Sequence, residues 1–361
     1  MIRIRRGVAK EITSRRQGIT EFLVSVEGEN QRAVNYDDLT GPVETGDEVL
    51  LNTTAVYKKL GTGGVHFVMG NLSGSGHDVS QEGHIMKLRY SPCQVKVISV
   101  EEQESPYAET MNQVESLAGT PVIIGTLHSM LAPVAAAIKK LSKASLKVAY
   151  LMTDGAAVPI GLSRMVTELK NKGLIDKTIT CGHAFGGDFE AINIYTGLLA
   201  CRAVAKADVI LVAMGPGIVG SGSRYGFTGV EQGEIVNAVN ILGGKPLTIP
   251  RISFADNRER HRGISHHTQT ALGKIALTKS TVVLPKLAPE KMELVFKQLE
   301  DSGISQKHDV AIVDASPALE ALQEYNIRVT TMGRSVQQDP EFFLAAGAAG
   351  VYLMAHLEML V

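Results

Sequence analysis

The sequence has no tryptophan, only three cysteines and no excess of charge of either sign. Cys93, Cys181 and Cys201 show no paired spacing, so we expect buried thiols in a reducing compartment rather than a disulfide framework. The 36 Lys and Arg residues balance 37 Asp and Glu residues, which excludes a general attraction to nucleic acid or to an anionic membrane. Any anion site must therefore be local, and nucleic-acid binding is not expected.

Long hydrophobic runs are also scarce. The amino terminus lacks the apolar segment and cleavage site of a signal peptide. Residues 342–355 are almost free of polar groups, but this run is shorter than the about 20 residues that span a bilayer. The run predicts a helix buried against a sheet, with a membrane-contacting tail as the alternative. We therefore expect a cytoplasmic protein with no membrane partner.

Two patterns divide the chain into a domain at residues 1–103 and another at residues 104–361. The first stretch alternates apolar and polar residues in short runs separated by Gly, Asn and Asp. This alternation is typical of a small antiparallel β-barrel or sandwich.

The second stretch alternates apolar strands with amphipathic helices, among them the predicted helices 189–205 and 266–277. Such strands indicate a mostly parallel sheet with both faces covered. Because the last unit is short, we expect a doubly wound, Rossmann-like α/β sheet, with a (β/α)₈ barrel as the alternative. The predicted strands are 122–127, 148–153, 178–182, 209–214, 247–252, 281–284, 310–313 and 328–332.

Both architectures place ligands at the carboxyl ends of the strands, and polar residues gather there in this sequence. For Ser129 and Ser316 we expect a helix N-cap role, which is a structural one. Capping does not explain the histidines and arginines at the other strand ends. Three motifs remain.

The first motif is the glycine-rich segment MGPGIVGSGSRYGFTG at residues 214–229. Glycines allow close backbone approach to a ligand, and exposed N–H groups can form an anion nest. The segment predicts a loop that holds phosphate or carboxylate, with a structural turn or a dinucleotide site as alternatives. Its candidate anion-binding residues are Gly215, Gly217, Gly220, Ser221, Ser223 and Arg224.

The second motif, RISFADNRERHRGISHH at residues 251–267, concentrates positive charge in a neutral chain. Arginine forks suit phosphate or carboxylate, so Arg258, Arg260, Arg262 and His267 are candidate anion ligands. His266 is a candidate proton donor or acceptor. The alternatives are an ion-pair network with Asp256 and Glu259 or a metal site formed by His261, His266 and His267 with Asp256, but the spacing matches no zinc pattern and no metal ligand is assigned.

The third motif is CGHAFGGDFE at residues 181–190. His183 ends a strand, and Asp188 could orient it for general acid–base work or could cap the next helix. Asp154, at the end of the strand 148–153, is a further candidate for orienting a histidine.

The phrases GHAFGGD, MGPGIVGSGSRYGFTG, RISFADNRERHRGISHHT and TMGRSVQQDPEFFLAAGAAG resemble a family of bacterial proteins of unknown function. The resemblance covers nearly the whole chain. It implies a cytosolic bacterial protein and carries over no activity, cofactor or catalytic residue.

The leading hypothesis is an enzyme that acts on a small anionic, phosphorylated or nucleotide-like substrate, because glycines, arginines and histidines converge on one sheet edge. The alternatives are a non-enzymatic ligand sensor or partner-binding protein, and a metal-dependent hydrolase. The cofactor is unknown, and a homo-oligomer is compatible with the sequence.

Overall fold

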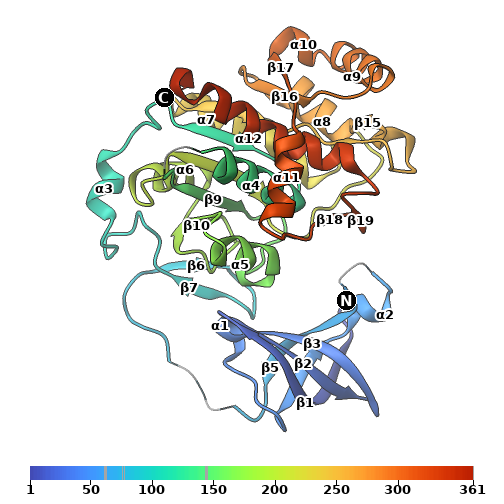
Figure 1. Cartoon of the computed structure of the whole chain (residues 1–361). Helices are drawn as coiled ribbons and strands as arrows, with labels where there is room; N and C mark the ends of the chain where they lie inside the picture. The colour runs from blue at the N-terminus through green and yellow to red at the C-terminus, as the bar shows by residue number, and fades with distance from the viewer. Residues whose placement is uncertain (61–62, 75, 77, 143–144, 361) are drawn as a thin grey trace. The chain divides into compact units, whose positions relative to one another are not determined.

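The chain folds into two compact units, Met1–Ile98 and Ser99–Val361. The computed structural model in Figure 1 describes residues 1–60, 63–74, 76, 78–142 and 145–360. The second unit therefore begins before its first strand, and residues 99–120 belong to it.

The first unit is built around a closed barrel with the strand order β1-β2-β3-β5-β4. Its interior is filled by alternate strand residues such as Phe22, Val24 and Leu51, each at most 1% exposed. The barrel predicted from the alternation is therefore confirmed, although β3 and β5 pair in parallel. The barrel strands are β1 (Ile4–Arg16), β2 (Ile19–Val26), β3 (Glu29–Tyr36), β4 (Glu48–Asn52) and β5 (Val65–Asn71), and the unit also contains α1 (Asp37–Thr40), α2 (Thr54–Tyr57) and a hairpin of β6 (Ile85–Lys87) and β7 (Val95–Val97).

The second unit contains a parallel sheet of eight strands in the order β11-β10-β9-β12-β8-β13-β16-β17. Within the described residues, the edge strands β11 and β17 do not pair with each other, so the sheet is open and the (β/α)₈ alternative is wrong. The strands are β8 (Pro121–Ile124), β9 (Val148–Thr153), β10 (Lys177–Cys181), β11 (Phe189–Ala191), β12 (Val209–Met214), β13 (Lys245–Thr248), β16 (Thr281–Pro285) and β17 (Asp309–Val313).

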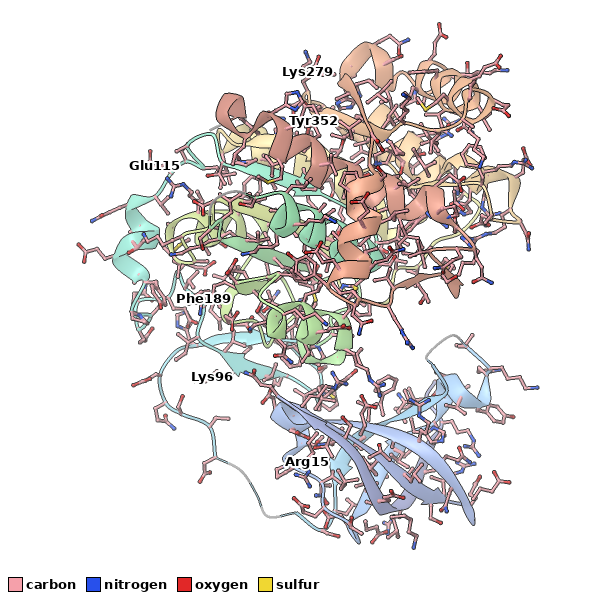
Figure 2. The ribbon with its side chains drawn as sticks, viewed as in Figure 1. Arg15, Lys96, Glu115, Phe189, Lys279 and Tyr352 are labelled. Atoms are coloured by element: carbon pink, nitrogen blue, oxygen red, sulfur yellow. The ribbon has the colours of Figure 1, made fainter. Side chains whose placement is uncertain are left out.

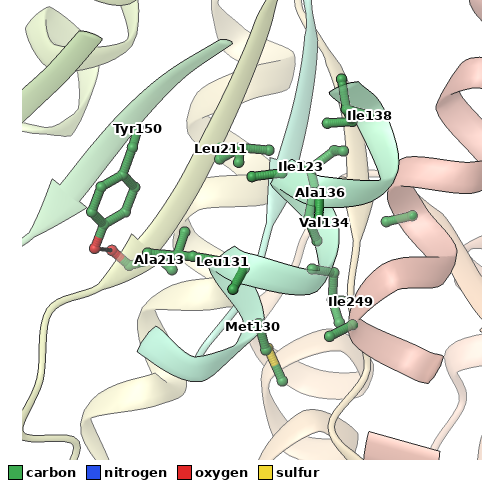
Figure 3. Close-up of a cluster of buried hydrophobic side chains, with 14 of the residues drawn as sticks. Ile123, Met130, Leu131, Val134, Ala136, Ile138, Tyr150, Leu211, Ala213 and Ile249 are labelled. Carbon is green, nitrogen blue, oxygen red and sulfur yellow. Dashed lines mark hydrogen bonds between the residues drawn. The ribbon is translucent and has the colours of Figure 1, made fainter. Parts of the chain in front are cut away.

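Helices cover both faces of this sheet, as a doubly wound fold requires. Successive strand residues face opposite sides: Ile123 packs into the core on one face, and Ile124 packs into the core on the other. Figure 3 shows Ile123 and Leu211 beside α4 on the first face. The first face carries α4 (Leu131–Leu141), α5 (Arg164–Asn171), α11 (Ser316–Glu324) and α12 (Pro340–Leu360), and the second carries α6 (Ile194–Ala203), α7 (Glu231–Ile241) and α9 (Pro289–Asp301).

The chain changes direction across the sheet at β8 and β12, which are neighbours. From β8 it runs through α4 to β9 on one side, whereas from β12 it runs through α7 to β13 on the other side. In open α/β sheets, the crevice at the carboxyl ends of such strands is the usual ligand site. The fold therefore places a candidate site beyond Ile124 and Met214.

Three predicted elements differ from the structure. Residues 328–332 lie outside the sheet, where β18 (Thr330–Thr331) forms a hairpin with β19 (Arg334–Ser335). The predicted helix 189–205 begins only at Ile194, because Phe189, labelled in Figure 2, opens the edge strand β11. The predicted helix 266–277 is α8 (His266–Thr270) followed by one π-helical segment (Ala271–Ile275).

Three predicted side-chain roles also differ. Ser129 and Ser316 do not cap helices: Ser129 donates to Thr331 Oγ1 over 3.3 Å, and Ser316 is the first residue of α11, one position beyond its cap. Cys181 and Cys201 are buried, but Cys93 is exposed.

The apolar run near the carboxyl end forms most of α12, as predicted. Among the described residues, α12 is the one helix long and apolar enough to cross a membrane. Phe342, Phe343 and Leu353 on this helix are at most 1% exposed and belong to the core on the first face of the sheet. The helix is therefore a core element of the α/β unit.

Candidate functional site

Two cavities open at the carboxyl ends of β8 and β12, and Leu127, Ile218 and Met332 line both. The smaller has a volume of about 160 Å³ and is lined by glycine-loop residues and by the second motif: Gly220, Ser221, Gly229, Arg251, Arg258, Arg260, His261 and His267. The larger has a volume of about 430 Å³, and its polar lining comes from His128, Ser129, Arg164, Glu168, Arg328, Thr330 and Thr331, with Gly215 and Gly217 beside them. The structure thus brings two of the three predicted motifs together.

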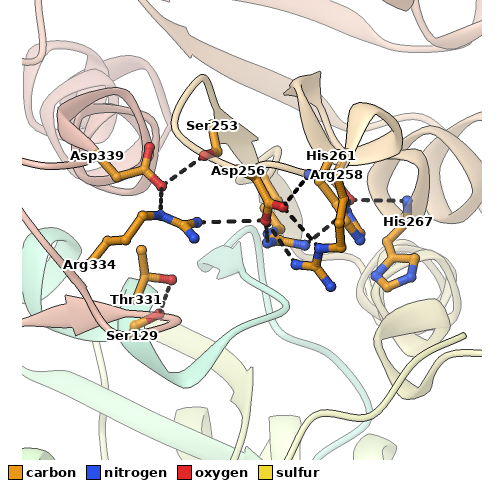
Figure 4. A network of polar contacts seen from close by, with 11 residues as sticks. Ser129, Ser253, Asp256, Arg258, His261, His267, Thr331, Arg334 and Asp339 are labelled. Carbon is orange, nitrogen blue, oxygen red and sulfur yellow. Dashed lines mark hydrogen bonds and ion pairs between the residues drawn. The ribbon is translucent and has the colours of Figure 1, made fainter.

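A buried carboxylate organises the arginines of the second motif (Figure 4). Asp256 accepts hydrogen bonds from Arg258 Nε over 2.9 Å and Nη2 over 2.8 Å, and from Arg251 Nη2 over 3.1 Å. The hydrogen bonds from Arg258 hold the pKa of Asp256 far below its usual range. Asp256 therefore stays ionised and fixes both guanidinium groups at the cavity wall.

The carboxyl-terminal hairpin joins the same network. Arg334 lies between two carboxylates, 2.9 Å from Asp339 Oδ2 and 3.6 Å from Asp256 Oδ2. Asp339, which is fully buried, also accepts a hydrogen bond from Ser253 Oγ over 2.7 Å. These contacts fix the β18–β19 hairpin, which carries Met332, over the arginine cluster.

Three histidines meet beside the smaller cavity. The His261 ring lies 5.0 Å from both the His266 ring and the His267 ring, which are 4.2 Å apart. His267 also stacks on Phe227 at 4.0 Å. Burial, followed by the charges of Arg251 and Arg258, lowers the pKa of His261 to about 3. Burial also lowers the pKa of His267 to about 4 and that of His266 below its usual value.

The glycine-rich loop closes on itself as a short hairpin. The Ser221 N–H donates to the Gly226 carbonyl over 2.8 Å, and the Ser221 and Ser223 hydroxyls bond each other over 2.8 Å. These groups are therefore engaged within the loop and do not form the open anion nest expected from the sequence. Arg224 is exposed and lines neither cavity. Gly217 has a φ of 114°, which L-residues rarely adopt.

Arg260 and Arg262 differ in position although they are two residues apart. Both are exposed, but only Arg260 lines the smaller cavity. The carbonyl of Arg262 accepts from Gln298, and its side chain lines neither cavity.

The third motif lies apart from both cavities. The backbone N–H of His183 donates to Asp154 Oδ2 over 2.9 Å. Asp188 neither orients His183 nor caps a helix, because it precedes β11 at the opposite, amino-terminal edge of the sheet. It pairs there with Lys170 at 2.6 Å and accepts from the Thr178 N–H over 2.8 Å. Its predicted catalytic role is therefore replaced by a structural one.

The sequence reasoning missed Glu231, the first residue of α7. Glu231 Oε1 accepts a hydrogen bond from Thr153 Oγ1 over 2.6 Å at the end of β9. Burial raises the pKa of this carboxyl to about 7, and the nearby charge of Asp154 adds to the shift. A carboxyl that titrates near neutrality at a strand end can transfer protons. The sequence signal that could have identified Glu231 is its position just after the glycine-rich segment at residues 214–229.

His128, just after β8, was also missed. Its Nε2 lies 2.5 Å from Ser163 Oγ, and its Nδ1 lies 3.3 Å from the hydroxyl of Tyr150. Burial lowers the pKa of His128 to about 4, so the imidazole is neutral at pH 7. Ser163 also accepts from the Val166 N–H as the N-cap of α5, which fixes its hydroxyl.

The sequence model of one protein family, described as "Protein of unknown function (DUF3866)", matches residues 32–350. No curated protein matches the chain. Among solved structures, one described as an FPGS–AMPPCP–folate complex is similar at 9% sequence identity with a TM-score of 0.25. That similarity covers 67% of this chain and 65% of the other.

Proposed function

Because the chain belongs to the DUF3866 family, whose function is unknown, we propose from its own residues that it is an enzyme acting on a small anionic ligand. The ligand is phosphorylated or nucleotide-like. Its anionic group binds in the smaller cavity, and its remaining part occupies the larger one, which falls within the usual size of ligand pockets.

The observation that carries this proposal is the charge of the smaller cavity. Arg251, Arg258 and Arg260 line it, and no carboxylate is among the described lining residues. Asp256 neutralises part of the charge of the first two, whereas no ion pair joins Arg260 to a described carboxylate. A guanidinium that faces a cavity without a partner is suited to phosphate or carboxylate.

Two titratable groups at the same sheet edge support an enzymatic role. Glu231 has a pKa near neutrality, and His128 lines the larger cavity. Strongly shifted titratable groups gather at catalytic sites more often than elsewhere. Of these two groups only His128 lines a cavity, so we assign contact with the ligand to His128, in preference to Glu231 or His183.

The test is isothermal titration with inorganic phosphate, pyrophosphate, nucleotides and sugar phosphates, followed by an assay for product. Arg260→Ala should weaken binding by about tenfold or more, since a hydrogen bond to a charged group is worth about 1.5–3 kcal/mol. Arg262→Ala is the matched control and should bind as the unaltered protein does. Equal affinities for both variants, or no binding of any anion, would reject the site, and binding without turnover would favour the sensor alternative.

A further inference from the structure

We propose that His261, His266 and His267 form a binding site for a divalent transition metal ion, of which zinc is the best match. One ligand atom from each histidine lies within 4.8 Å of the other two. This proposal does not rest on the proposed anionic ligand, although His261 and His267 line the same cavity.

The local path of the chain explains why His261, His266 and His267 lie close together. His261 ends a short 3₁₀ segment (Glu259–His261), and His266 and His267 open α8. Between them, β15 (Gly263–Ile264) pairs with β14 (Ile252–Ser253) and turns the chain back on itself. The adjacent rings of His266 and His267 are inclined by 50°, so both can approach the His261 ring.

Buried donor atoms without partners are the second observation. Nε2 of His266 and Nε2 of His267 are both buried, and neither makes a well-oriented hydrogen bond among the described residues, although the His267 ring lies near enough to the Ser221 backbone for that contact to raise its pKa. Buried polar atoms normally have partners, and each exception calls for an unseen water, ion or ligand. Neutral imidazole nitrogens are preferred ligands of zinc, copper and nickel.

His261 supplies its ligand through Nε2, because Nδ1 is already engaged. Nδ1 lies 2.7 Å from Ser265 Oγ and 3.0 Å from Arg251 Nη1. Ligation through Nε2 places the ring proton on Nδ1, where Ser265 accepts it. Because Arg251 Nη1 can only donate, its hydrogen bond to Nδ1 must then be given up, while Arg251 keeps its ion pair with Asp256. An acceptor on the second ring nitrogen usually orients a metal-bound histidine, and the Ser265 hydroxyl takes that place here.

Three protein ligands leave a coordination position open, as in catalytic rather than structural zinc sites. His261 and His267 line the smaller cavity together with Arg260. The open position therefore faces the cavity, where water or an anionic group can complete the coordination and offset the charge of the arginines.

The experiment uses the full chain, freed of any affinity tag and stripped with a chelator. Elemental analysis after dialysis against zinc should give one ion per chain, and cobalt(II) should give the intense visible absorption of a four-coordinate site. Each of His261→Ala, His266→Gln and His267→Gln should weaken binding more than the about 10- to 100-fold that loss of an outer partner costs. No retained metal, or unchanged affinity in all three variants, would overturn the proposal.

His356→Ala is the matched control, because His356 lies on α12, contacts Tyr352 one turn earlier and lines neither cavity. Thermal unfolding of the stripped variants separates loss of a ligand from loss of the fold, and His266→Gln keeps a polar group of similar size. Phosphate binding is measured on the same stripped samples. Metal binding without phosphate binding would reject the proposed function alone, and the reverse result would reject the metal site alone.

Discussion

Arg251 and Asp256 form a buried ion pair of 3.1 Å, in which the side chains are 7% and 3% exposed. The same carboxylate also bonds Arg258 and lies 3.6 Å from Arg334. One buried negative charge therefore holds three guanidinium groups. Such an arrangement is costly to break, because removal of the carboxylate leaves positive charges facing one another.

Asp256→Asn should lower the free energy of unfolding by about 3–5 kcal/mol, the usual cost of an uncompensated buried charge. Urea unfolding at pH 7 measures this change. Asp309→Asn is the control, since Asp309 pairs with Lys279 on the surface, where both side chains are more than 60% exposed. The control should lose less than about 1 kcal/mol. Equal losses would show that the network around Asp256 is not the stabilising element.

Glu231 should make the protein less stable as the pH rises. Its pKa is about 7 in the folded chain, above the ordinary value of 4.5, so the folded state binds more protons between these values. The stability contribution is complete below pH 4.5 and is lost as the pH rises through 7, by at most about 3 kcal/mol. Glu231→Gln should remove this fall, which chemical unfolding across pH 4–8 measures. Parallel pH profiles for the variant and the unaltered chain would contradict the assignment.

His128 should act in the opposite direction over an overlapping range. Its pKa is about 4 in the folded chain, below the ordinary value of 6.5, so stability falls as the pH decreases from 6.5 towards 4. His128→Gln should remove this acid sensitivity, again by at most about 3 kcal/mol. Because the two effects oppose each other, the unaltered chain should show a flatter profile than either single variant. A steep profile that neither substitution alters would assign the titration to other groups.

Gly217→Ala should destabilise the chain by about 1–3 kcal/mol, the cost of a strained backbone conformation. Gly217 has a φ of 114°, and a Cβ there would lie 2.7 Å from Ala156 Cβ. Gly222→Ala in the same loop is the control, because the nearest atom to its Cβ would be Arg260 Nη1 at 4.0 Å. Thermal unfolding compares the two. A neutral effect at position 217 would mean that the loop relaxes freely.

The fold was predictable where hydrophobic runs are continuous. Residues 148–153 and 209–214 are fully buried strands, and their predicted bounds match β9 and β12. The edge strand β11 was wrongly predicted as helix, because its three residues are too few to show a periodicity. In addition, its central residue Glu190 is charged but buried, where it accepts a hydrogen bond from Thr180. Tertiary pairing decides such short strands, and local sequence does not reveal it.

The candidate site was predictable in position but less so in composition. Arg258, Arg260 and His267 do line the smaller cavity, because their motif follows strands that end at one edge. Asp188 was misassigned because it is close to His183 in sequence. In the structure Asp188 lies at the amino-terminal end of β10, whereas His183 follows the carboxyl-terminal end of that strand. Arg334 and Asp339 were not among the candidate residues, because their partners lie far away in the chain.

The contribution of Met332, Arg334 and Asp339 sets the order in which the site can assemble. All eight strands of the large sheet have been synthesised by Val313, whereas the wall of both cavities requires Met332. During translation, the nascent chain can therefore complete the sheet while its arginine cluster still lacks the carboxyl-terminal hairpin. A chain that ends before Met332 would therefore lack one wall of both cavities together with α12, which packs into the core.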